Sequence, residues 1–260
     1  MTRDAVMPSE GRTNPEYLES ATKLFAAEKA ASVASLGLRS GDAALDVGCG
    51  RCDDVALLAQ AVAPDGFAVG LDSDPSMVEI AQGRIAGIDR AYVFLGEASA
   101  MPFDDDAFAA ARVERALQHM VEPELAVAEM ARVVRPGGRI AAAEPDWNTL
   151  ALAGADRATT AEVLAACTDG IPTPDAGRHL ARWFRDAGLD VLRVEAVAMP
   201  MLRLDVAASI LELERAVAVV GTPAARAWLD DLRELDARGG FVAAGIGFGV
   251  LGRVPTGDGN

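Results

Sequence analysis

The chain has 260 residues, and 51% of them are hydrophobic, so it can bury a sizeable core and suits a single domain with insertions. Its net charge of −15 argues against nucleic acid or an anionic membrane as a partner, because both are themselves negatively charged. The N-terminus lacks the apolar core of a signal peptide, and the longest apolar stretch, 241–251, is shorter than the roughly 20 residues that span a bilayer. We therefore expect a cytoplasmic protein that does not enter a membrane.

The first 150 residues predict an alternation of strands and helices. A helix is expected over 15–36, where Pro15 suits its start and Gly37 and Gly41 end it. The pattern then predicts strands at 43–47, 67–71, 91–95, 108–113 and 139–143, with helices at 53–62, 75–85 and 123–135 between them. This order indicates an α/β fold with a doubly wound, mostly parallel sheet, in which ligands bind at the carboxyl ends of the strands.

The second half of the chain is less regular. Helices are predicted at 156–167, 177–187, 205–219 and 223–237, and strands at 189–198 and 241–252. The last strand is expected to pair antiparallel beside the sixth. Three segments have no place in a core sheet, namely 1–36, 148–176 and 200–238, and we expect them to form helical lids over a ligand pocket.

Residues 45–52, Leu-Asp-Val-Gly-Cys-Gly-Arg-Cys, are the most informative stretch. An apolar strand ends abruptly in Gly48 and Gly50, and a helix follows. Glycine lets the backbone approach a ligand closely, and the N–H groups of a new helix face whatever lies there. Asp46 places a negative charge before the turn, which does not suit a plain phosphate site. It suits a ligand that carries an ammonium group or a positive sulfur.

Cys49 and Cys52 form a C-x-x-C pattern, and with Cys167 the chain holds three cysteines, which does not indicate a disulfide framework. The pair has two interpretations. It is either a redox or zinc site, or simply two small side chains around a glycine turn. Structural zinc takes four ligands, and the chain has only two histidines, so no metal site is predicted.

Two acidic residues follow the next strands. Asp72 ends a strand 22 residues after Gly50, where a carboxylate can accept both hydroxyls of a ribose, although the alternative is a helix N-cap before Pro75. Glu97 follows the third strand and can accept an exocyclic adenine amine, although the alternative is an ordinary solvated acid.

Taken together, these motifs resemble the class I S-adenosylmethionine-dependent methyltransferases, most closely the small-molecule type of ubiquinone and menaquinone biosynthesis. The resemblance covers about residues 17–145 and implies a Rossmann-like, seven-stranded sheet. It is carried by Leu45-Asp46-Val47-Gly48-Cys49-Gly50, Gly70-Leu71-Asp72, Gly96-Glu97-Ala98, Met101-Pro102-Phe103, Leu117-Gln118-His119 and Arg132-Val133-Val134-Arg135-Pro136-Gly137-Gly138.

The resemblance implies a role for each matching position. The residues expected to contact S-adenosylmethionine are Gly48, Cys49 and Gly50 under its methionine part, Asp46 near its ammonium, Asp72 at the ribose, Ser73 and Met77 beside the adenine, Glu97 and Ala98 at the adenine amine, and Glu114 along the floor. Tyr17 stands where the family often places a lid residue. Three positions depart from the pattern: Cys52 replaces a third glycine, Glu97 replaces an aspartate, and Ala109 replaces an acid.

Three further residues are placed at the mouth of the predicted cleft. His119, just after the fourth strand, is the candidate general base, although it can instead be a histidine that bonds a backbone carbonyl or caps a helix. Glu144 and Trp147 follow the fifth strand and are expected to line the acceptor pocket, where Trp147 can stack on an aromatic ring. The alternative for Trp147 is packing under the helical insertion.

The sequence therefore predicts methyl transfer from S-adenosylmethionine to a small-molecule acceptor, in specialised metabolism. One alternative is a protein that keeps the cofactor fold without methylating, such as a cyclase or a binding protein. A second is a nicotinamide-dependent dehydrogenase, although its G-x-G-x-x-G pattern requires glycine at the position of Asp53. The acceptor atom and the oligomeric state are left open.

Overall fold

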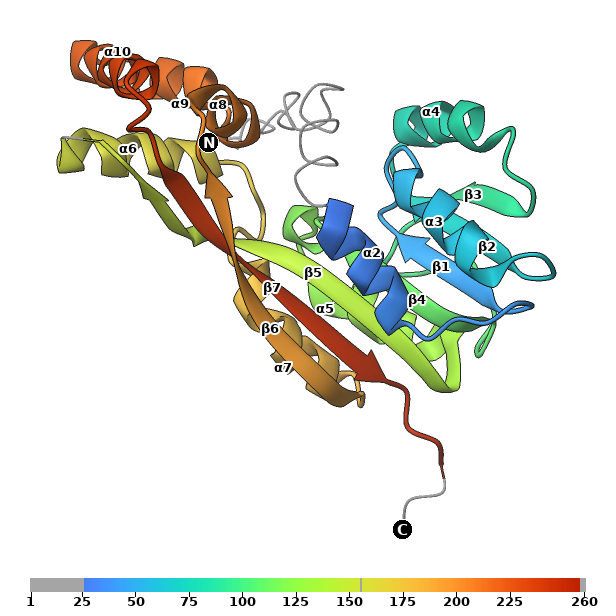
Figure 1. Cartoon of the computed structure of the whole chain (residues 1–260). Helices are drawn as coiled ribbons and strands as arrows, with labels where there is room; N and C mark the ends of the chain where they lie inside the picture. The colour runs from blue at the N-terminus through green and yellow to red at the C-terminus, as the bar shows by residue number, and fades with distance from the viewer. Residues whose placement is uncertain (1–25, 155, 258–260) are drawn as a thin grey trace, which may run out of the picture. The chain divides into compact units, whose positions relative to one another are not determined.

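The computed structural model describes residues 26–154 and 156–257, and Figure 1 shows their arrangement. Tyr17 and most of the first predicted helix therefore lie outside the described residues. The elements in chain order are α2 (Ala26–Ser35), β1 (Ala43–Val47), α3 (Asp53–Val62), β2 (Phe67–Asp72), α4 (Pro75–Ile85), β3 (Ala91–Leu95), β4 (Phe108–Glu114), the 3-10 helix η2 (Leu117–His119), α5 (Pro123–Val133), β5 (Val134–Leu152), α6 (Arg157–Thr168), α7 (Ala176–Asp186), β6 (Asp190–Met201), α8 (Leu204–Leu211), α9 (Leu213–Val220), α10 (Pro223–Ala237) and β7 (Ala243–Arg253).

The strands form one seven-stranded sheet in the order β3-β2-β1-β4-β5-β7-β6. The pairs β1–β2, β1–β4, β2–β3 and β4–β5 are parallel. The chain order reverses at β1, because β2 lies on one side of it and β4 on the other. The prediction of an α/β fold with a mostly parallel, doubly wound, seven-stranded sheet is confirmed.

The described chain divides into two compact units. Among the described residues, unit 1 holds Asp146–Pro174 and Ala198–Ile246, and unit 2 holds Ala27–Pro145, Asp175–Val197 and 247–257. β5 and β6 both begin in unit 2 and end in unit 1, whereas β7 begins in unit 1 and ends in unit 2. β7 therefore runs in the opposite direction to its two neighbours in the sheet, β5 and β6. The antiparallel direction predicted for the last strand is confirmed. The three lids remain predictions.

Two predicted boundaries are wrong in the second half. The strand expected at 139–143 is the middle of the 19-residue β5, so residues 148–152 are extended rather than helical. They find partners there: Thr149 Oγ1 accepts the Ile246 N–H at 2.8 Å, and Ala153 N–H donates to Val242 at 2.9 Å. The helix expected at 205–219 is two helices, because Glu212 between them is left-handed with φ 52°.

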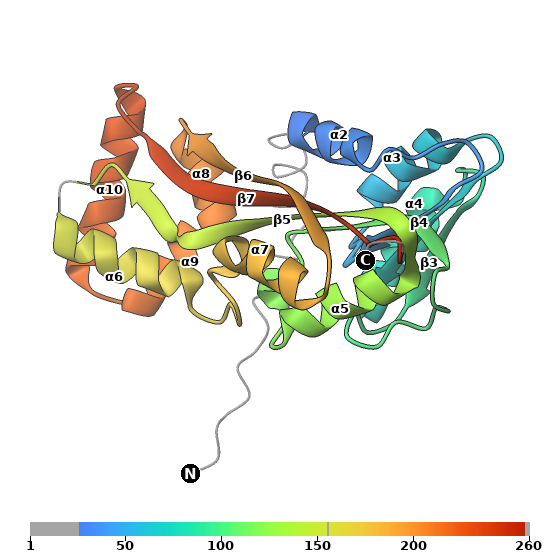
Figure 2. The same cartoon turned by 90° about the horizontal axis from the view of Figure 1, so that it is seen from below.

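Two apolar layers enclose the sheet of unit 2. Because side chains alternate along a strand, Leu45 and Val47 of β1 face the layer formed with α5 and α7, whereas Ala44 faces α2, α3 and α4. Figure 2 shows α2 and α3 on one side of this sheet and α5 and α7 on the other. Both faces of the sheet are therefore covered, as parallel sheets require.

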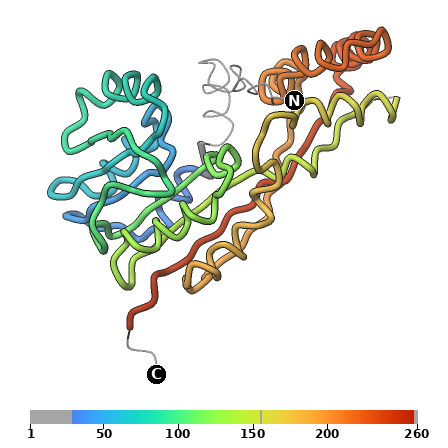
Figure 3. Tube along the Cα trace, turned by 180° about the vertical axis from the view of Figure 1, so that it is seen from behind, coloured from blue at the N-terminus to red at the C-terminus, as the bar shows by residue number. Residues whose placement is uncertain are grey.

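Unit 1 has an apolar core of its own. Helices α6, α8, α9 and α10 pack around buried side chains that include Val163, Leu213 and Trp228, and Figure 3 shows these helices from behind in yellow and orange. The Trp228 indole N–H donates to Thr160 Oγ1 at 2.8 Å, which satisfies its polar atom inside this core. No helix within 26–154 and 156–257 is long and apolar enough to cross a membrane.

β3 is an edge strand with an exposed aromatic face. Tyr92 is 50% exposed and Phe94 is 46% exposed. The ring of Tyr92 lies edge-on to Phe67 at 6.3 Å between centroids, and that of Phe94 lies edge-on to Phe103 at 5.8 Å. None of the five residues of β3 is charged.

Gly70, in the middle of β2, makes room for two cysteines. A Cβ there would lie 2.6 Å from Cys49 Sγ and 2.8 Å from Cys52 Sγ. We expect Gly70→Ala to lower the free energy of unfolding by about 1–3 kcal/mol, because the buried thiols must shift. Chemical denaturation measures this change. Gly83→Ala is the matched control, because a Cβ at Gly83 of α4 meets nothing and alanine should stabilise that helix by about 0.5–1 kcal/mol. Equal effects of the two substitutions would contradict the tight packing at Gly70.

Candidate functional site

The chain turns sharply after β1. Gly48 and Gly50 have φ of 65° and 50°, and Cys52, which precedes α3, has φ of 62°. Gly48 and Cys49 N–H groups both donate to the Leu71 carbonyl, at 2.8 and 3.0 Å, so β2 holds the turn. A Cβ at Gly48 would lie 2.3 Å from Ala116 Cβ, whereas one at Gly50 would meet nothing within 4 Å. The turn is therefore packed tightly at Gly48 and open at Gly50.

Asp72 lies against this turn at the carboxyl end of β2. Its Oδ2 accepts the Gly50 N–H at 2.7 Å, and its Oδ1 accepts the Asp74 N–H at 3.0 Å. The N-cap of α4 is Asp74, whose side chain accepts the Ser76 N–H at 2.8 Å, so the capping alternative for Asp72 is wrong. Each Asp72 oxygen keeps a further lone pair for a ligand hydroxyl.

The end of β3 is joined to the same place. Leu95 is in register with Asp72, and the Gly96 N–H donates to the Asp72 carbonyl at 2.9 Å. Glu97 and Ser73 are exposed beside these strand ends, Met77 is half-buried on α4, and Ala98 is buried. The structure thus brings the predicted turn, ribose and adenine residues to the carboxyl ends of three adjacent strands.

Asp46 is buried, and it belongs to a cluster of charged side chains beneath the turn. It lies directly opposite Arg112 of β4, whose guanidinium is 4.0 Å from its carboxylate. Burial raises the pKa of Asp46 to about 7, although Arg112 opposes the rise. The remaining ion pairs of this cluster are Arg112–Asp54 at 3.0 Å, Arg112–Glu114, Lys29–Asp54 at 2.5 Å, Lys29–Glu114 at 3.7 Å and Arg115–Glu114 at 3.4 Å.

The sequence analysis missed the cations of this cluster. Arg112 is fully buried, and it is the one charged residue in the run 108–113, which was a signal that could have been followed. Although burial pushes the pKa of Asp54 upward, Arg112 and Lys29 outweigh that effect and hold the pKa below its usual value. Glu114 thus contacts protein cations beneath the turn, and its predicted contact with a cofactor stays a prediction.

Arg51 is a second residue that the sequence analysis missed. It follows Gly50 directly, and its Nη2 lies 3.0 Å from Asp53. Its Nε is buried and has no hydrogen-bond partner among the described residues. An unsatisfied guanidinium N–H beside an open glycine turn fits the carboxylate of an amino-acid ligand.

Cys49 and Cys52 are free thiols whose sulfurs lie 3.4 Å apart. Both are buried, and the hydrogen bond from Cys52 together with burial raises the pKa of Cys49 far above its usual value. Within the described residues, no group of three or more His, Cys, Asp or Glu side chains is placed to hold a metal ion. The two thiols instead fill the space that Gly70 leaves.

His119 follows the end of β4, and Glu144 lies in the middle of the neighbouring strand β5. Glu144 Oε1 accepts the N–H groups of Ala116 and Leu117 at 2.8 and 2.7 Å, and burial raises the pKa of Glu144 to about 8. His119 is exposed in η2, and its N–H donates to the Ala116 carbonyl at 3.0 Å. Trp147 is buried in the apolar core of unit 1, and its role toward an acceptor stays a prediction.

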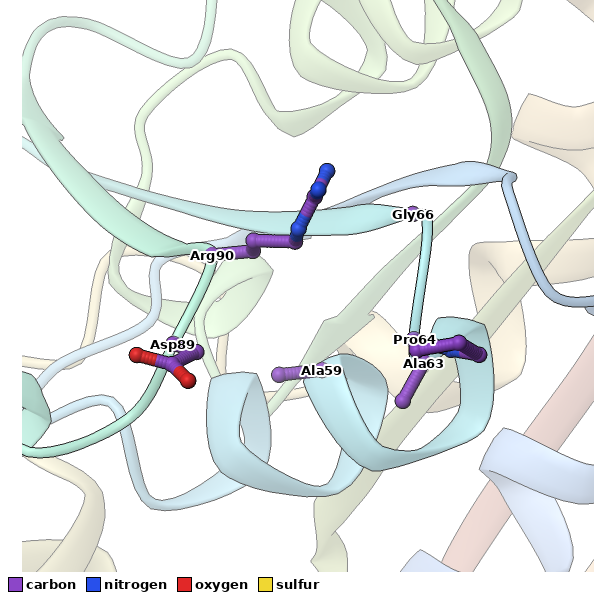
Figure 4. Close-up of a pocket in the computed structure, with 6 residues that line it drawn as sticks. All are labelled: Ala59, Ala63, Pro64, Gly66, Asp89 and Arg90. Carbon is purple, nitrogen blue, oxygen red and sulfur yellow. The ribbon is translucent and has the colours of Figure 1, made fainter.

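Two hollows lie at the opposite, amino ends of the strands. The first has a volume of about 440 Å³ and is lined by Ala59, Ala63, Pro64, Gly66, Asp89 and Arg90, as Figure 4 shows. The second, of about 460 Å³, lies beside 36–42 and 135–139. None of the predicted site residues lines either hollow, so both are separate from the candidate site.

The family model described as a methyltransferase domain matches residues 38–188. The chain is 38% identical over 237 residues to an uncharacterized 37.1 kDa protein of a Streptomyces fradiae transposon, covering 88% of this chain and 68% of that protein. It is 33% identical over 115 residues to the demethylmenaquinone methyltransferase of Staphylococcus aureus, covering 44% of this chain and 48% of that enzyme.

A crystal structure of an S-adenosylmethionine-dependent methyltransferase from Aquifex aeolicus has the same fold. Its TM-score is 0.57 at 20% identity, and the match covers 96% of this chain and 99% of that one. The fold, the family match and the glycine turn with Asp72 agree with the resemblance found in the sequence. The chain therefore belongs to the methyltransferase-domain family and is a class I methyltransferase that uses S-adenosylmethionine.

Proposed function

We propose that this protein transfers the methyl group of S-adenosylmethionine to a small-molecule acceptor of specialised metabolism. The observation that carries the proposal is the convergence of the open glycine turn, Asp72 and Glu97 at adjacent strand ends. When bound, S-adenosylmethionine would supply a methyl group on a positively charged sulfur: a lone pair of the acceptor would bond to the methyl carbon as the C–S bond breaks, and neutral S-adenosylhomocysteine would leave.

The residues of the chain fit this ligand part by part. Gly50 leaves open space for the methionine part, and the Arg51 Nε–H is a donor for its carboxylate. Asp72 keeps acceptor capacity for two ribose hydroxyls, and Glu97 accepts the adenine amine. Asp46 and Glu114 are proposed to lie beside the positive end of the ligand, although Arg112 pairs with both carboxylates.

The chain's part in the transfer is to position the reactants and to remove a proton. Holding two reactants in line supplies roughly 7–11 kcal/mol toward lowering such a barrier. His119, exposed after β4, accepts the proton of a hydroxyl, phenol or amine acceptor as the acceptor becomes methylated. Tyr17 and Trp147 are proposed to contact the acceptor.

Incubation with methyl-labelled S-adenosylmethionine tests the proposal. The panel of acceptors begins with demethylmenaquinone, which the name of the Staphylococcus aureus relative suggests, and extends to phenols, amines and thiols. We expect a labelled product, and we expect His119→Ala to lower kcat by about 100-fold without changing cofactor affinity. His179→Ala, on α7, is the matched control and should keep full activity. Binding of the cofactor with no labelled product from any acceptor would contradict the proposal and favour a non-methylating protein.

A further inference from the structure

Glu144 differs from an ordinary acid at the edge of a pocket. It lies in the middle of the long strand β5, and the residue is only 2% exposed. One oxygen, Oε1, accepts two backbone N–H groups, from Ala116 and Leu117. The other oxygen, Oε2, is buried without a hydrogen-bond partner among the described residues. A carboxyl group held in this way points at the backbone of the chain, not at solvent.

Helix α7 lies close to the backbone of β5 at Glu144. A Cβ at Gly177, near the start of α7, would lie 2.6 Å from the Glu144 carbonyl oxygen and 3.0 Å from that of Pro145. The missing side chain of Gly177 lets α7 lie directly against this part of β5. Burial without full compensation favours the neutral form of a carboxyl group, and the pKa of about 8 agrees with a protonated Glu144 at neutral pH.

The two N–H groups that Glu144 accepts belong to a turn that contacts two parts of the candidate site. Ala116 is packed against Gly48, because a Cβ at Gly48 would lie 2.3 Å from its own Cβ. His119 ends the same turn and donates its N–H to the Ala116 carbonyl at 3.0 Å. The turn begins at Arg115, which is left-handed with φ 55° and donates its N–H to the Ala143 carbonyl at 2.9 Å.

We infer that Glu144 is a positioning residue that fixes the 115–119 turn, and through it both Gly48 of the cofactor loop and the candidate base His119. This positioning role replaces the predicted role of Glu144 as a residue that lines the acceptor pocket. The inference rests on the proposed function only for its effect on His119. The effect on the turn itself is independent of any acceptor. One buried carboxyl group thus joins the middle of β5 to the ends of β1 and β4.

Amide hydrogen exchange of the full chain tests the effect on the turn. Glu144→Leu removes the acceptor of the Ala116 and Leu117 N–H groups, so we expect both amides to exchange at least about tenfold faster. Glu144→Gln keeps a carbonyl oxygen at the same place and should keep both amides protected. Glu124→Leu, an exposed glutamate at the start of α5, is the matched control. Unchanged exchange in Glu144→Leu, or equal loss in both Glu144 variants, would overturn the inference.

Two further measurements separate positioning from a merely structural role. Calorimetry with S-adenosylhomocysteine, which needs no acceptor, should show weaker binding in Glu144→Leu by about tenfold and unchanged binding in Glu144→Gln, because Ala116 supports Gly48. A double-mutant cycle should show that Glu144→Leu lowers kcat in the wild type but hardly lowers it in His119→Ala. Additive losses would overturn the link to His119. If the wild type methylates nothing, the proposed function fails, and exchange and binding still decide the role of Glu144.

Discussion

Replacing Arg112 with methionine is expected to lower the free energy of unfolding by about 3–5 kcal/mol. Arg112 is fully buried, and it faces three carboxylates, those of Asp46, Asp54 and Glu114. Methionine fills much of the same volume but leaves these acids with too little positive charge, and burying an unpaired charge is costly. Within the described part of the chain, Lys29 pairs with Asp54 and Glu114 and not with Asp46, so Asp46 loses its main partner. Urea denaturation at pH 8, where the acids are most charged, measures the loss.

The pH dependence of this loss identifies its cause. Protonation removes the uncompensated charge, so the difference between Arg112→Met and the wild type should shrink as the pH falls from 8 to 5. Arg135→Met is the matched control. Its guanidinium pairs with Asp42 at 2.9 Å but is 55% exposed, so its loss should stay within about 1 kcal/mol. If Arg112→Met lowers the free energy of unfolding by no more than Arg135→Met does, the stabilising role of the buried charge cluster is contradicted.

The second large effect is expected at Asp72. Asp72→Ala should weaken the binding of S-adenosylhomocysteine by about 100-fold or more. Two hydrogen bonds from ribose hydroxyls to a charged acceptor contribute about 1.5–3 kcal/mol each, and about 1.4 kcal/mol corresponds to a factor of ten. The loss of the Gly50 N–H contact, at 2.7 Å, acts in the same direction because it loosens the turn. Isothermal titration calorimetry measures the affinity directly.

Asp74→Ala is the control for this substitution. Asp74 lies two residues away and caps α4 through the Ser76 N–H at 2.8 Å. Its loss should cost about 1 kcal/mol of stability and leave the affinity for S-adenosylhomocysteine unchanged. Equal affinities of the wild type and Asp72→Ala would refute the assignment of the ribose site, whatever the stability of either variant.

The first half of the fold follows from local signals in the sequence. The strands at 43–47, 67–71 and 91–95 are apolar, and Gly48, Asp72 and Gly96 mark their ends. The second half depends on pairing between distant segments. Residues 148–152 have no strand signal of their own and are extended because the start of β7 offers hydrogen-bond partners almost 100 residues away in the sequence. Glu212 breaks a helix in a left-handed conformation that glycine, not glutamate, usually signals.

The candidate site divides in the same way. Its glycines and Asp72 are recognisable because turns and strand ends fix their chemistry locally. The sequence marks Arg112 as a charge in an apolar run, but it does not show that Arg112 faces Asp46, because that contact depends on the pairing of β1 with β4. The contacts of Glu144 with the N–H groups of Ala116 and Leu117 likewise span 28 and 27 residues, so they depend on how β5 packs beside the end of β4.

The aromatic edge strand has a consequence for how the molecules behave toward one another. β3 offers a row of backbone donors and acceptors beyond the sheet and carries no charged side chain to discourage a neighbour. Mutual repulsion between molecules of net charge −15 therefore supplies the main protection against edge-to-edge aggregation. That repulsion reaches about 10 Å at 0.1 M salt but only about 3 Å at 1 M. A high salt concentration, or a pH near the isoelectric point of about 4.5, therefore removes the repulsion between molecules.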